Sequence, residues 1–424
     1  MKAILKTWTL RTLRGLARRR IKQIRPRIIG ITGSVGKTGA KEAIAAVLEQ
    51  KFRVKKTEGN MNTEFGVALS LLDQKAPYSS LWAWICVLTK ALKNSVKRVA
   101  SYDMLVLEMG VDKPGDMDEL LKVVRPEVMV FLNVQAVHVG EGQFPNREAI
   151  FHEKSKSCYA VNPDGWAVLN ADDSFTKQLI DKLPCHVLSI GQDEKADLRA
   201  SNIKSDEKGL HFSLHYEDNE HAVHLPHVLG ACHVYLALAA IATGFLQGLS
   251  WSEIEAGLRN FKLPPGRMNR IEGKNGSVLI DSSYNASPES VEAGLRLLQE
   301  FSGRRIAALG TMNELGELTE SAHLRIGKLV GETADLLIAV GAEAKTLAEG
   351  AQLSGLSSSM IHVFQNSKEA GTFLSELLEP GDVVLIKGSQ NKVRMEHVTK
   401  ACMKHPELAK SLLVRQDPHW LTVL

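Results

Sequence analysis

The chain has 424 residues, of which 44% are hydrophobic and 24% are charged, which is enough for two or three globular domains with their own cores. Its five cysteines are scattered without CxxC spacing, so we expect a reducing cytoplasm and neither a disulfide framework nor a structural zinc site. Residues 1–27 contain ten Lys or Arg and no Asp or Glu, whereas the rest of the chain is net acidic, so nucleic acid is not an expected partner.

Residues 1–27 are expected to form a basic amphipathic helix that ends at Pro26. Apolar residues recur there at steps of three and four, and basic side chains follow the same rhythm on the opposite side. The apolar positions are Leu10, Leu13, Ala17, Ile21 and Ile24. Because Arg and Lys interrupt them, we expect no signal peptide, and no segment of the chain reaches the ~18 uncharged apolar residues of a membrane span.

Residues 28–263 are expected to form a central domain with a mostly parallel sheet. Apolar runs of strand length occupy residues 28–31, 104–107 and 128–132, and helical patterns separate them. Residues 186–225 alternate in short stretches and are expected to form a small antiparallel patch. Residues 76–101 interrupt the domain as an insertion that contains Trp82, Trp84, Lys90 and Lys93 and no acidic residue.

The run Leu263-Pro264-Pro265-Gly266 marks a boundary, and residues 264–424 are expected to form a second domain. Strand-like runs at 278–280, 305–309, 336–340 and 383–386 alternate there with helical patterns. This alternation is typical of a doubly wound, Rossmann-like domain. The expected fold class is therefore α/β, with a central domain followed by a C-terminal Rossmann-like domain.

A candidate phosphate-binding loop lies between the strand at 28–31 and a helix at 40–50. Its residues are Thr32, Gly33, Ser34, Val35, Gly36, Lys37 and Thr38. In this context the glycines let main-chain N–H groups point inward, Lys37 can neutralise the phosphates of ATP, and Thr38 can hold Mg²⁺. The strict pattern has Gly where Ile31 stands, so an ordinary glycine turn is the alternative.

Six short motifs follow this loop in order and spread over both expected domains. They are Thr57-Glu58-Gly59-Asn60-Met61-Asn62, Leu107-Glu108-Met109-Gly110, Asn133 with His138, Asp281-Ser282-Ser283-Tyr284-Asn285-Ala286-Ser287-Pro288, Leu309-Gly310-Thr311-Met312-Asn313-Glu314-Leu315-Gly316 and Lys387-Gly388-Ser389. With these motifs the chain resembles the Mur ligases from residue 28 nearly to the C-terminus. Any one motif is weak, but their order over two domains is specific.

The resemblance implies an ATP-dependent ligase that joins a carboxylate to an amine through an acyl phosphate. Within the family the chain is most similar to the members that add D-alanyl-D-alanine to UDP-N-acetylmuramoyl-tripeptide in peptidoglycan precursor synthesis. The expected partners are these small molecules, the expected cofactors are ATP and two Mg²⁺ ions, and we expect a monomer. Phosphoryl transfer needs such cations around the transferred group.

The resemblance also assigns roles around the metal ions. Glu108 is implied as a magnesium ligand, and His138 as a ligand of the second metal or of the phosphate. Lys154 is implied to be carbamylated by CO₂, so that it supports Mg²⁺ as a carboxylate. The alternatives are a helix-capping Glu, a satisfied core His and a solvated helix Lys. Lys156 stands where the family usually has an acidic residue.

Further roles are carried over to the substrates. The loop with Thr57, Asn60 and Asn62 is implied to face the muramoyl peptide. The residues implied to meet ATP from the C-terminal side are Arg267, Asp281, Tyr284 and Asn285. The residues implied to line the pocket for the incoming amine are Asn313, Glu314, Lys387 and Ser389.

Other positions depart from the family. Ser282 and Thr311 replace usual aspartates, and Leu236 stands where an Asn is usual. Only 27 residues precede the first expected strand, where family members have a domain that grips UDP, so we expect UDP to be held differently or the substrate to differ. A ligase of the poly-γ-glutamate, cyanophycin or folate-glutamate type is therefore an alternative. A catalytically silent nucleotide-binding scaffold at the membrane is another.

The basic helix in residues 1–27 and the insertion at 76–101 share a composition. Both join apolar and aromatic residues to Lys and Arg without an acidic residue. This composition is consistent with contact to an anionic membrane surface. Packing of the two segments on each other, or on a partner, explains it equally well.

Overall fold

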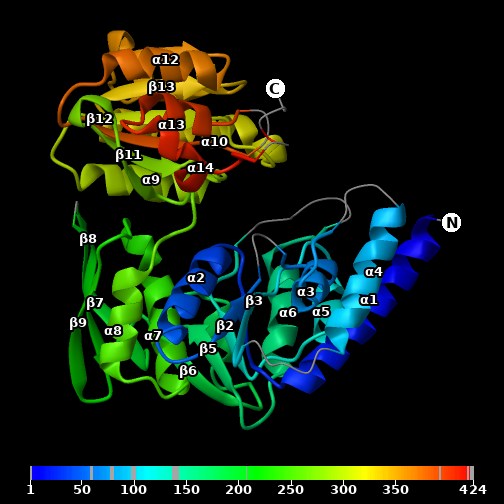
Figure 1. Ribbon diagram of the computed structural model, residues 1–424. Coiled ribbons are helices and arrows are strands. Elements are labelled where there is room, and N and C mark those ends of the chain that lie inside the picture. The colour runs from blue at the N-terminus through cyan, green and yellow to red at the C-terminus, as the bar shows by residue number, and fades with distance from the viewer. Residues whose placement is uncertain are drawn as a thin grey trace. The chain divides into compact units, whose positions relative to one another are not determined.

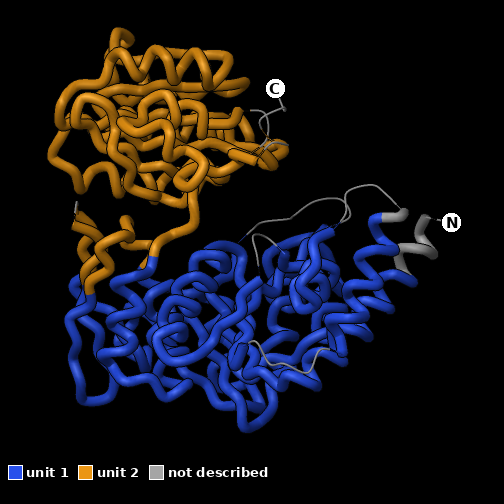
Figure 2. The backbone as a smooth tube through the Cα atoms, in the orientation of Figure 1, with its two compact units in different colours: residues 1–202, 212–223, 234–261 blue, residues 203–211, 224–233, 262–424 orange. Residues whose placement is uncertain are grey.

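The computed structural model describes residues 2–57, 61–76, 81–96, 102–135, 143–206, 208–390, 393–417 and 420. The chain divides into two compact units (Figure 2). Unit 1 comprises residues 1–202, 212–223 and 234–261, and unit 2 comprises residues 203–211, 224–233 and 262–424.

Unit 1 is built around a nine-stranded sheet, in the order β2-β3-β1-β4-β5-β6-β7-β8-β9. The strands are β1 Arg27–Thr32, β2 Val54–Lys56, β3 Met104–Glu108, β4 Val128–Phe131, β5 Trp166–Asn170, β6 His186–Gly191, β7 Leu198–Asp206, β8 Gly209–Tyr216 and β9 Asn219–Leu225. Parallel pairing connects β2 through β7. β1 lies between β3 and β4, so the carboxyl ends of these three strands meet at one edge.

The expected antiparallel patch is smaller than residues 186–225. β6 pairs in parallel with β5 and with the start of β7, so the prediction is wrong for residues 186–191. The Asp197 carboxylate accepts hydrogen bonds from Ser189 N at 2.7 Å and from Ser189 Oγ at 2.6 Å, which holds the short connection between β6 and β7. β7, β8 and β9 are joined by two-residue connections, which can link only antiparallel neighbours.

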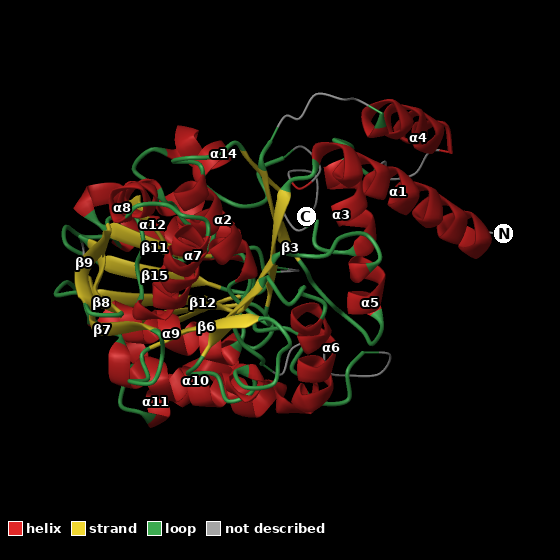
Figure 3. Ribbon diagram, turned by 90° about the horizontal axis from the view of Figure 1, so that it is seen from below, coloured by secondary structure: helices red, strands yellow, loops and turns green. Residues whose placement is uncertain are grey.

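Eight helices in the described part of unit 1 pack in two groups, on either side of the sheet (Figures 1 and 3). One group contains α2 Lys37–Leu48, α7 Val234–Leu246 and α8 Trp251–Asn260. The other contains α1 Lys2–Ile24, α3 Glu64–Leu71, α4 Leu81–Ser95, α5 Asp116–Leu121 and α6 Arg147–Tyr159. Burying both faces of the sheet explains why its central strands are continuously apolar.

The basic N-terminal segment is part of this fold. α1 packs on α3 and α4, and Leu13 and Ala17 on its apolar face are fully buried. Packing of the basic helix on the insertion is therefore present, because α4 lies within residues 76–101. No helix in the described part of the chain combines the length and the apolar character that crossing a membrane requires.

A second, six-stranded sheet forms the core of unit 2, in the order β10-β11-β15-β12-β13-β14. The strands are β10 Asn269–Glu272, β11 Val278–Ser282, β12 Arg305–Gly310, β13 Leu336–Val340, β14 Ile361–Phe364 and β15 Val383–Lys387. The helices are α9 Pro288–Gln299, α10 Thr319–Thr333, α11 Ala344–Leu353, α12 Ser367–Leu377, α13 Glu396–Cys402 and α14 Ala409–Leu412. Apart from the antiparallel edge strand β10 the pairing is parallel. Two apolar clusters fill its interior, as a doubly wound α/β fold requires.

Candidate active site

The loop between β1 and α2 forms the centre of the site in unit 1. Gly33 and Gly36 have φ angles of 149° and 86°, which side chains with a Cβ rarely adopt. Thr32 is buried, and its hydroxyl donates to Met109 O at 2.9 Å, which ties the loop to the end of the neighbouring strand β3. The loop leads directly into the N-terminus of α2, and the N-terminus of a helix favours an anion.

Asn133, which follows β4, holds the tip of this loop. Its Oδ1 accepts hydrogen bonds from Ser34 N at 3.2 Å and Val35 N at 3.0 Å, and its Nδ2 donates to Val35 O at 3.1 Å. One amide side chain therefore fixes three main-chain groups. The adjacent Gln135 N donates to Ser34 Oγ at 2.8 Å. This frame preorganises the loop before any ligand arrives.

The Lys37 side chain folds back over the loop. Its Nζ donates to Gly33 O at 2.7 Å and to Ser34 O at 3.1 Å. Lys154 reaches the same place from α6, because its Nζ donates to Gly33 O at 3.0 Å. The side-chain nitrogens of Lys37 and Lys154 thus meet at one carbonyl oxygen of the phosphate loop.

Burial and the neighbouring Lys37 hold the pKa of Lys154 well below its usual range, although Asp112 and Glu153 act in the opposite direction. Lys154 is only 2% exposed. Among the described residues its ammonium forms no ion pair with a carboxylate, and the adjacent Glu153 instead accepts from Gly115 N and Met117 N. Lys154 therefore supplies a buried amine that loses its proton more easily than an exposed lysine does.

Glu108 lies at the carboxyl end of β3 and is 2% exposed. Its Oε2 accepts a hydrogen bond from Thr38 Oγ1 at 3.3 Å, and its Oε1 lies 3.1 Å from Lys41 Nζ. Oε1 is a buried atom without a hydrogen bond of good geometry among the described residues. A buried carboxylate beside a hydroxyl at a phosphate loop is the set of hard oxygen donors that Mg²⁺ prefers. These residues fit the expected ion.

Lys41 is a site residue that the sequence analysis missed. It is fully buried, and besides facing Glu108 its Nζ donates to Thr57 O at 2.7 Å. It therefore connects the carboxylate at the phosphate loop with the segment expected to face the substrate. The available signal was a lysine in the middle of an otherwise buried, alanine-rich helix, where a charge needs a partner.

The expected substrate loop is partly outside the described residues. Asn60 lies there, and so does His138, so the structure does not place either side chain. Thr57 is buried, and its N–H donates to Val106 O at 3.2 Å. The main-chain carbonyl of Asn62 accepts a hydrogen bond from Gly110 N at 3.0 Å, which ties the loop to the segment after β3.

The predicted ATP residues of unit 2 lie directly after Gly266 and at and after the end of β11. The Arg267 guanidinium lies 4.3 Å from the centre of the Tyr284 ring, and Tyr284 N donates to Gly266 O at 3.1 Å. Gly266 has a φ of 74°, which this turn requires. Asn285 is exposed, but Asp281 is fully buried and accepts from Thr399 Oγ1 at 2.9 Å. Burial raises the pKa of Asp281 to about 6.

The predicted amine-pocket residues of unit 2 lie where β12 and β15 end. Lys387 Nζ donates to Ser282 Oγ at 3.0 Å and to Asn285 O at 2.9 Å, and burial lowers its pKa to about 8. Ser389 Oγ accepts from Asn313 N at 2.8 Å. Asn313 and Glu314 also line a hollow of about 340 Å³, together with residues from the ends of β12 and β13.

A second group that the sequence analysis missed supports the Tyr284 segment. Glu396 is fully buried between Arg394 and Arg415, whose Nε atoms lie 3.0 and 3.3 Å from its Oε1. Arg415 also donates to Ser283 O at 2.9 Å and to Tyr284 O at 3.3 Å. The segment near the C-terminus thus holds the main chain beside the predicted ATP residues.

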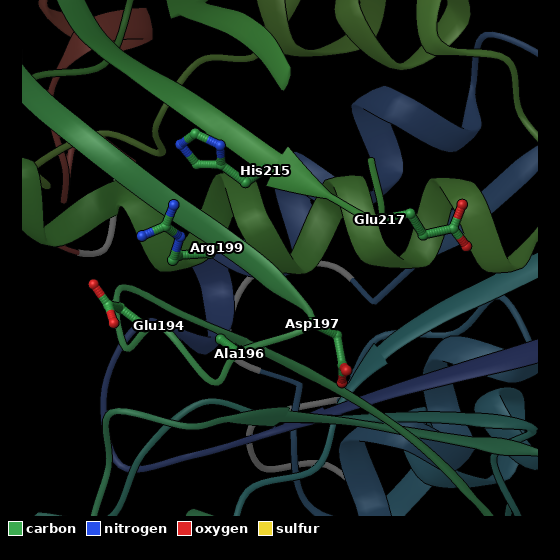
Figure 4. A pocket seen from close by; sticks show the side chains of 6 residues that line it. All are labelled: Glu194, Ala196, Asp197, Arg199, His215 and Glu217. Atoms are coloured by element: carbon green, nitrogen blue, oxygen red, sulfur yellow. The ribbon is translucent and has the colours of Figure 1, made fainter. Parts of the chain in front are cut away.

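A polar hollow of about 420 Å³ in unit 1 contains none of the predicted site residues (Figure 4). Its lining residues are Glu194, Ala196, Asp197, Arg199, His215 and Glu217. They come from the connection before β7, from β7 itself, and from the end of β8 and the turn after it. The hollow has no loop with glycines and no helix N-terminus, so its chemistry differs from that of the phosphate loop.

Two family models match the chain, the Mur ligase middle domain over residues 31–244 and the Mur ligase glutamate ligase domain over residues 266–390. The UDP-N-acetylmuramoyl-tripeptide--D-alanyl-D-alanine ligase of Bacillus subtilis is 28% identical over 401 residues, which are 94% of this chain and 80% of that protein. The protein of the same name from Mycobacterium tuberculosis is 31% identical over 387 residues, which are 85% and 70%.

The chain is also similar to a solved structure of such a ligase. The crystal structure of MurF ligase from Thermotoga maritima in complex with ADP has a TM-score of 0.76 at 28% identity, and the match covers 94% of this chain and 84% of that one. The similarity to these ligases extends over both units of the chain.

Proposed function

This chain belongs to the Mur ligase family, and on that premise we propose that it adds D-alanyl-D-alanine to UDP-N-acetylmuramoyl-tripeptide with ATP as the energy source. The names of the relatives supply the two substrates. The observation that carries the chemistry is the convergence of Lys37 and Lys154 on Gly33 O, with Glu108 and Thr38 in hydrogen-bond contact beside them.

The proposed reaction has two steps. An oxygen of the donor carboxylate attacks the γ-phosphorus of ATP, the bond from that phosphorus to ADP breaks, and an acyl phosphate forms. The amine nitrogen of D-alanyl-D-alanine then attacks the acyl carbon and loses a proton, and inorganic phosphate leaves with the electrons of the C–O bond. Because of the first step, the amine displaces phosphate, a good leaving group, instead of the poorly leaving oxygen of a free carboxylate.

The residues of unit 1 would serve the first step. The loop N–H groups and Lys37 would hold the phosphates, since their charge is fixed where the transferred group gains negative charge. Thr38 and Glu108 would hold one Mg²⁺, and His138 together with a carbamate on Lys154 would hold the second. When bound, these ions neutralise the phosphate oxygens and orient them.

The carbamate proposal follows from the position of Lys154. A neutral amine, not an ammonium, adds to CO₂, and the adduct loses a proton to give an anion. The lowered pKa of Lys154 makes the neutral amine more abundant at a given pH. The anion would also relieve the repulsion between Lys154 and Lys37.

The residues of unit 2 would serve ATP and the amine. We assign Arg267, Tyr284 and Asn285 to the nucleotide, together with Asp281, which is buried and bound to Thr399 at the end of β11. Asn313, Glu314, Lys387 and Ser389 would bind D-alanyl-D-alanine. Their support is the hollow beside Asn313 and the position of Lys387 at the end of β15. We also propose that the protein acts as a monomer in the cytoplasm.

The experiment follows ADP release and the mass of the product with the full-length protein, ATP and MgCl₂. We expect turnover only when UDP-N-acetylmuramoyl-tripeptide and D-alanyl-D-alanine are both present, with one ADP per peptide bond. Turnover only with another acid and amine would instead support a ligase of the poly-γ-glutamate, cyanophycin or folate-glutamate type. Absence of turnover with every pair would support a silent scaffold and contradict the proposal.

A further inference from the structure

Helix α1 is fixed to unit 1 by its apolar face. Leu13 and Ala17 are fully buried and belong to one core cluster with Val87 and Ala91 of α4. Arg14 adds an ion pair with Glu119 of α5. The apolar face is therefore used within the fold, and only the opposite face of α1 is offered to a partner.

The outward face of α1 carries a regular stripe of exposed residues. Its positions follow steps of three and four, which keeps them on one side of a helix. They are Trp8, Arg11, Gly15, Arg18 and Lys22, and Arg19 is exposed beside them. Trp8 is 57% exposed despite its size. The stripe is thus cationic along its length with an aromatic residue at one end.

The outward face of α4 carries a second stripe, which is apolar. Ile85 and Leu92 are 44% and 52% exposed, Thr89 lies between them at the same helical spacing, and Val96, directly after the helix, is 42% exposed. Lys90 and Lys93 are exposed next to this stripe. An apolar stripe flanked by lysines on a solvent-facing helix is unusual unless a partner covers it.

The two stripes lie on neighbouring helices and include most of the large hydrophobic residues that unit 1 exposes in its described part. α1 and α4 lie side by side, away from the central strands (Figures 1 and 3). Of the six large hydrophobic residues that unit 1 exposes in its described part, Trp8, Ile85 and Leu92 are on these helices and Val96 directly follows α4; the others are Val35 and Tyr159. The charged residues at this end of the chain are all positive, since residues 1–27 contain ten basic residues and no acidic one.

We propose that the outward stripes of α1 and α4 form a docking surface for an anionic phospholipid bilayer. The basic side chains would contact the headgroups, while Trp8, Ile85 and Leu92 would enter the boundary between headgroups and acyl chains. Charge complementarity and aliphatic exposure together favour lipid: a nucleic acid would match the cations but not an aliphatic stripe. The surface contains no residue of the proposed active site, so it stands independently of the ligase proposal.

Flotation of the full-length protein with lipid vesicles tests this surface. Vesicles of equal parts phosphatidylglycerol and phosphatidylcholine are compared with vesicles of phosphatidylcholine alone. We expect binding to the anionic vesicles, and loss of that binding in about 1 M NaCl, where the screening length falls to about 3 Å. Equal binding to both kinds of vesicle, or to neither, would overturn the proposal.

Two variants locate the surface. Arg11→Glu/Arg18→Glu is expected to lower partitioning to anionic vesicles by about 30-fold or more, because two cations of the interface are lost and two anions take their place. Leu92→Ser is expected to lower it by about tenfold through the lost apolar contact. Lys182→Glu and Leu353→Ser are matched controls at exposed positions outside both helices and should bind like the unchanged protein.

The thermal midpoint, the turnover, the vesicle binding and the oligomeric state are measured for each variant. All four variants should keep their thermal midpoint and their turnover in solution, since each change is at an exposed side chain. Vesicle binding that is unchanged in both the α1 and the α4 variant would show that another surface binds lipid and would overturn the proposal. A concentration-dependent dimer that Leu92→Ser abolishes, without vesicle binding, would assign the stripes to a second copy of the chain and overturn the lipid proposal.

Discussion

Replacing Lys37 by methionine is expected to lower turnover by about 10²–10³-fold without unfolding the protein. The Lys37 Nζ lies at the phosphate loop, 2.7 Å from Gly33 O. A positive charge fixed where a phosphoryl group is transferred contributes about 3–4 kcal/mol to the transition state. Methionine keeps most of the length of the side chain and removes the charge. Steady-state ADP release with both substrates measures the change.

The matched control for this variant is Lys51→Met. Lys51 follows the same helix and is exposed, and its Nζ donates to Gly248 O at 2.6 Å, away from the loop. We expect it to turn over at the unchanged rate. An active Lys37→Met protein would contradict the proposed role. So would a loss of turnover that merely follows a fall in the thermal midpoint.

Replacing Lys154 by alanine is expected to lower turnover by about 100-fold, and formate or acetate is expected to restore part of it. The magnitude is that of a group that supports a metal ion. A small carboxylate can enter the space that the side chain leaves and supply the anionic oxygens of the proposed carbamate. Turnover is measured over a series of formate and acetate concentrations.

Lys156→Ala is the control on the same helix. Its ammonium is partly exposed and pairs with Asp118 and Glu153, so its removal should cost little. Rescue by formate of Lys154→Ala, but not of Lys37→Met, is the specific signature of a missing carboxylate. Unchanged activity of Lys154→Ala without added acid would eliminate the carbamate role.

The sequence predicts the two parallel sheets because their inner strands are continuous apolar runs. β3, β13 and β15 are buried at every position, so each leaves a clear signal. β10 and β14 are not predicted from the sequence, because neither of them is a continuous apolar run. They are four-residue edge strands that are mostly partly exposed, and no apolar run distinguishes them from a loop. Tertiary pairing, not local preference, makes them strands.

In the site, too, local motifs can be predicted from the sequence, whereas contacts between distant residues cannot. The phosphate loop is a local motif, and the sequence alone indicates its residues. The buried ion pair of Lys41 with Glu108 depends on residues 67 positions apart, and the Glu396–Arg415 pair matters because it reaches Ser283 and Tyr284 across the fold. Such partners come together only when elements from distant parts of the chain pack together. Side-chain identity alone cannot predict which of many charged residues will pair.

Transfer of isotope from the acid to phosphate tests the central chemistry most directly. The terminal carboxylate of UDP-N-acetylmuramoyl-tripeptide is labelled with ¹⁸O, and the phosphate released with ATP and D-alanyl-D-alanine is analysed by mass spectrometry. An acyl phosphate leaves one carboxylate oxygen on phosphorus, so we predict one ¹⁸O in each phosphate released. Unlabelled phosphate, formed at the rate of peptide-bond synthesis, would contradict the account.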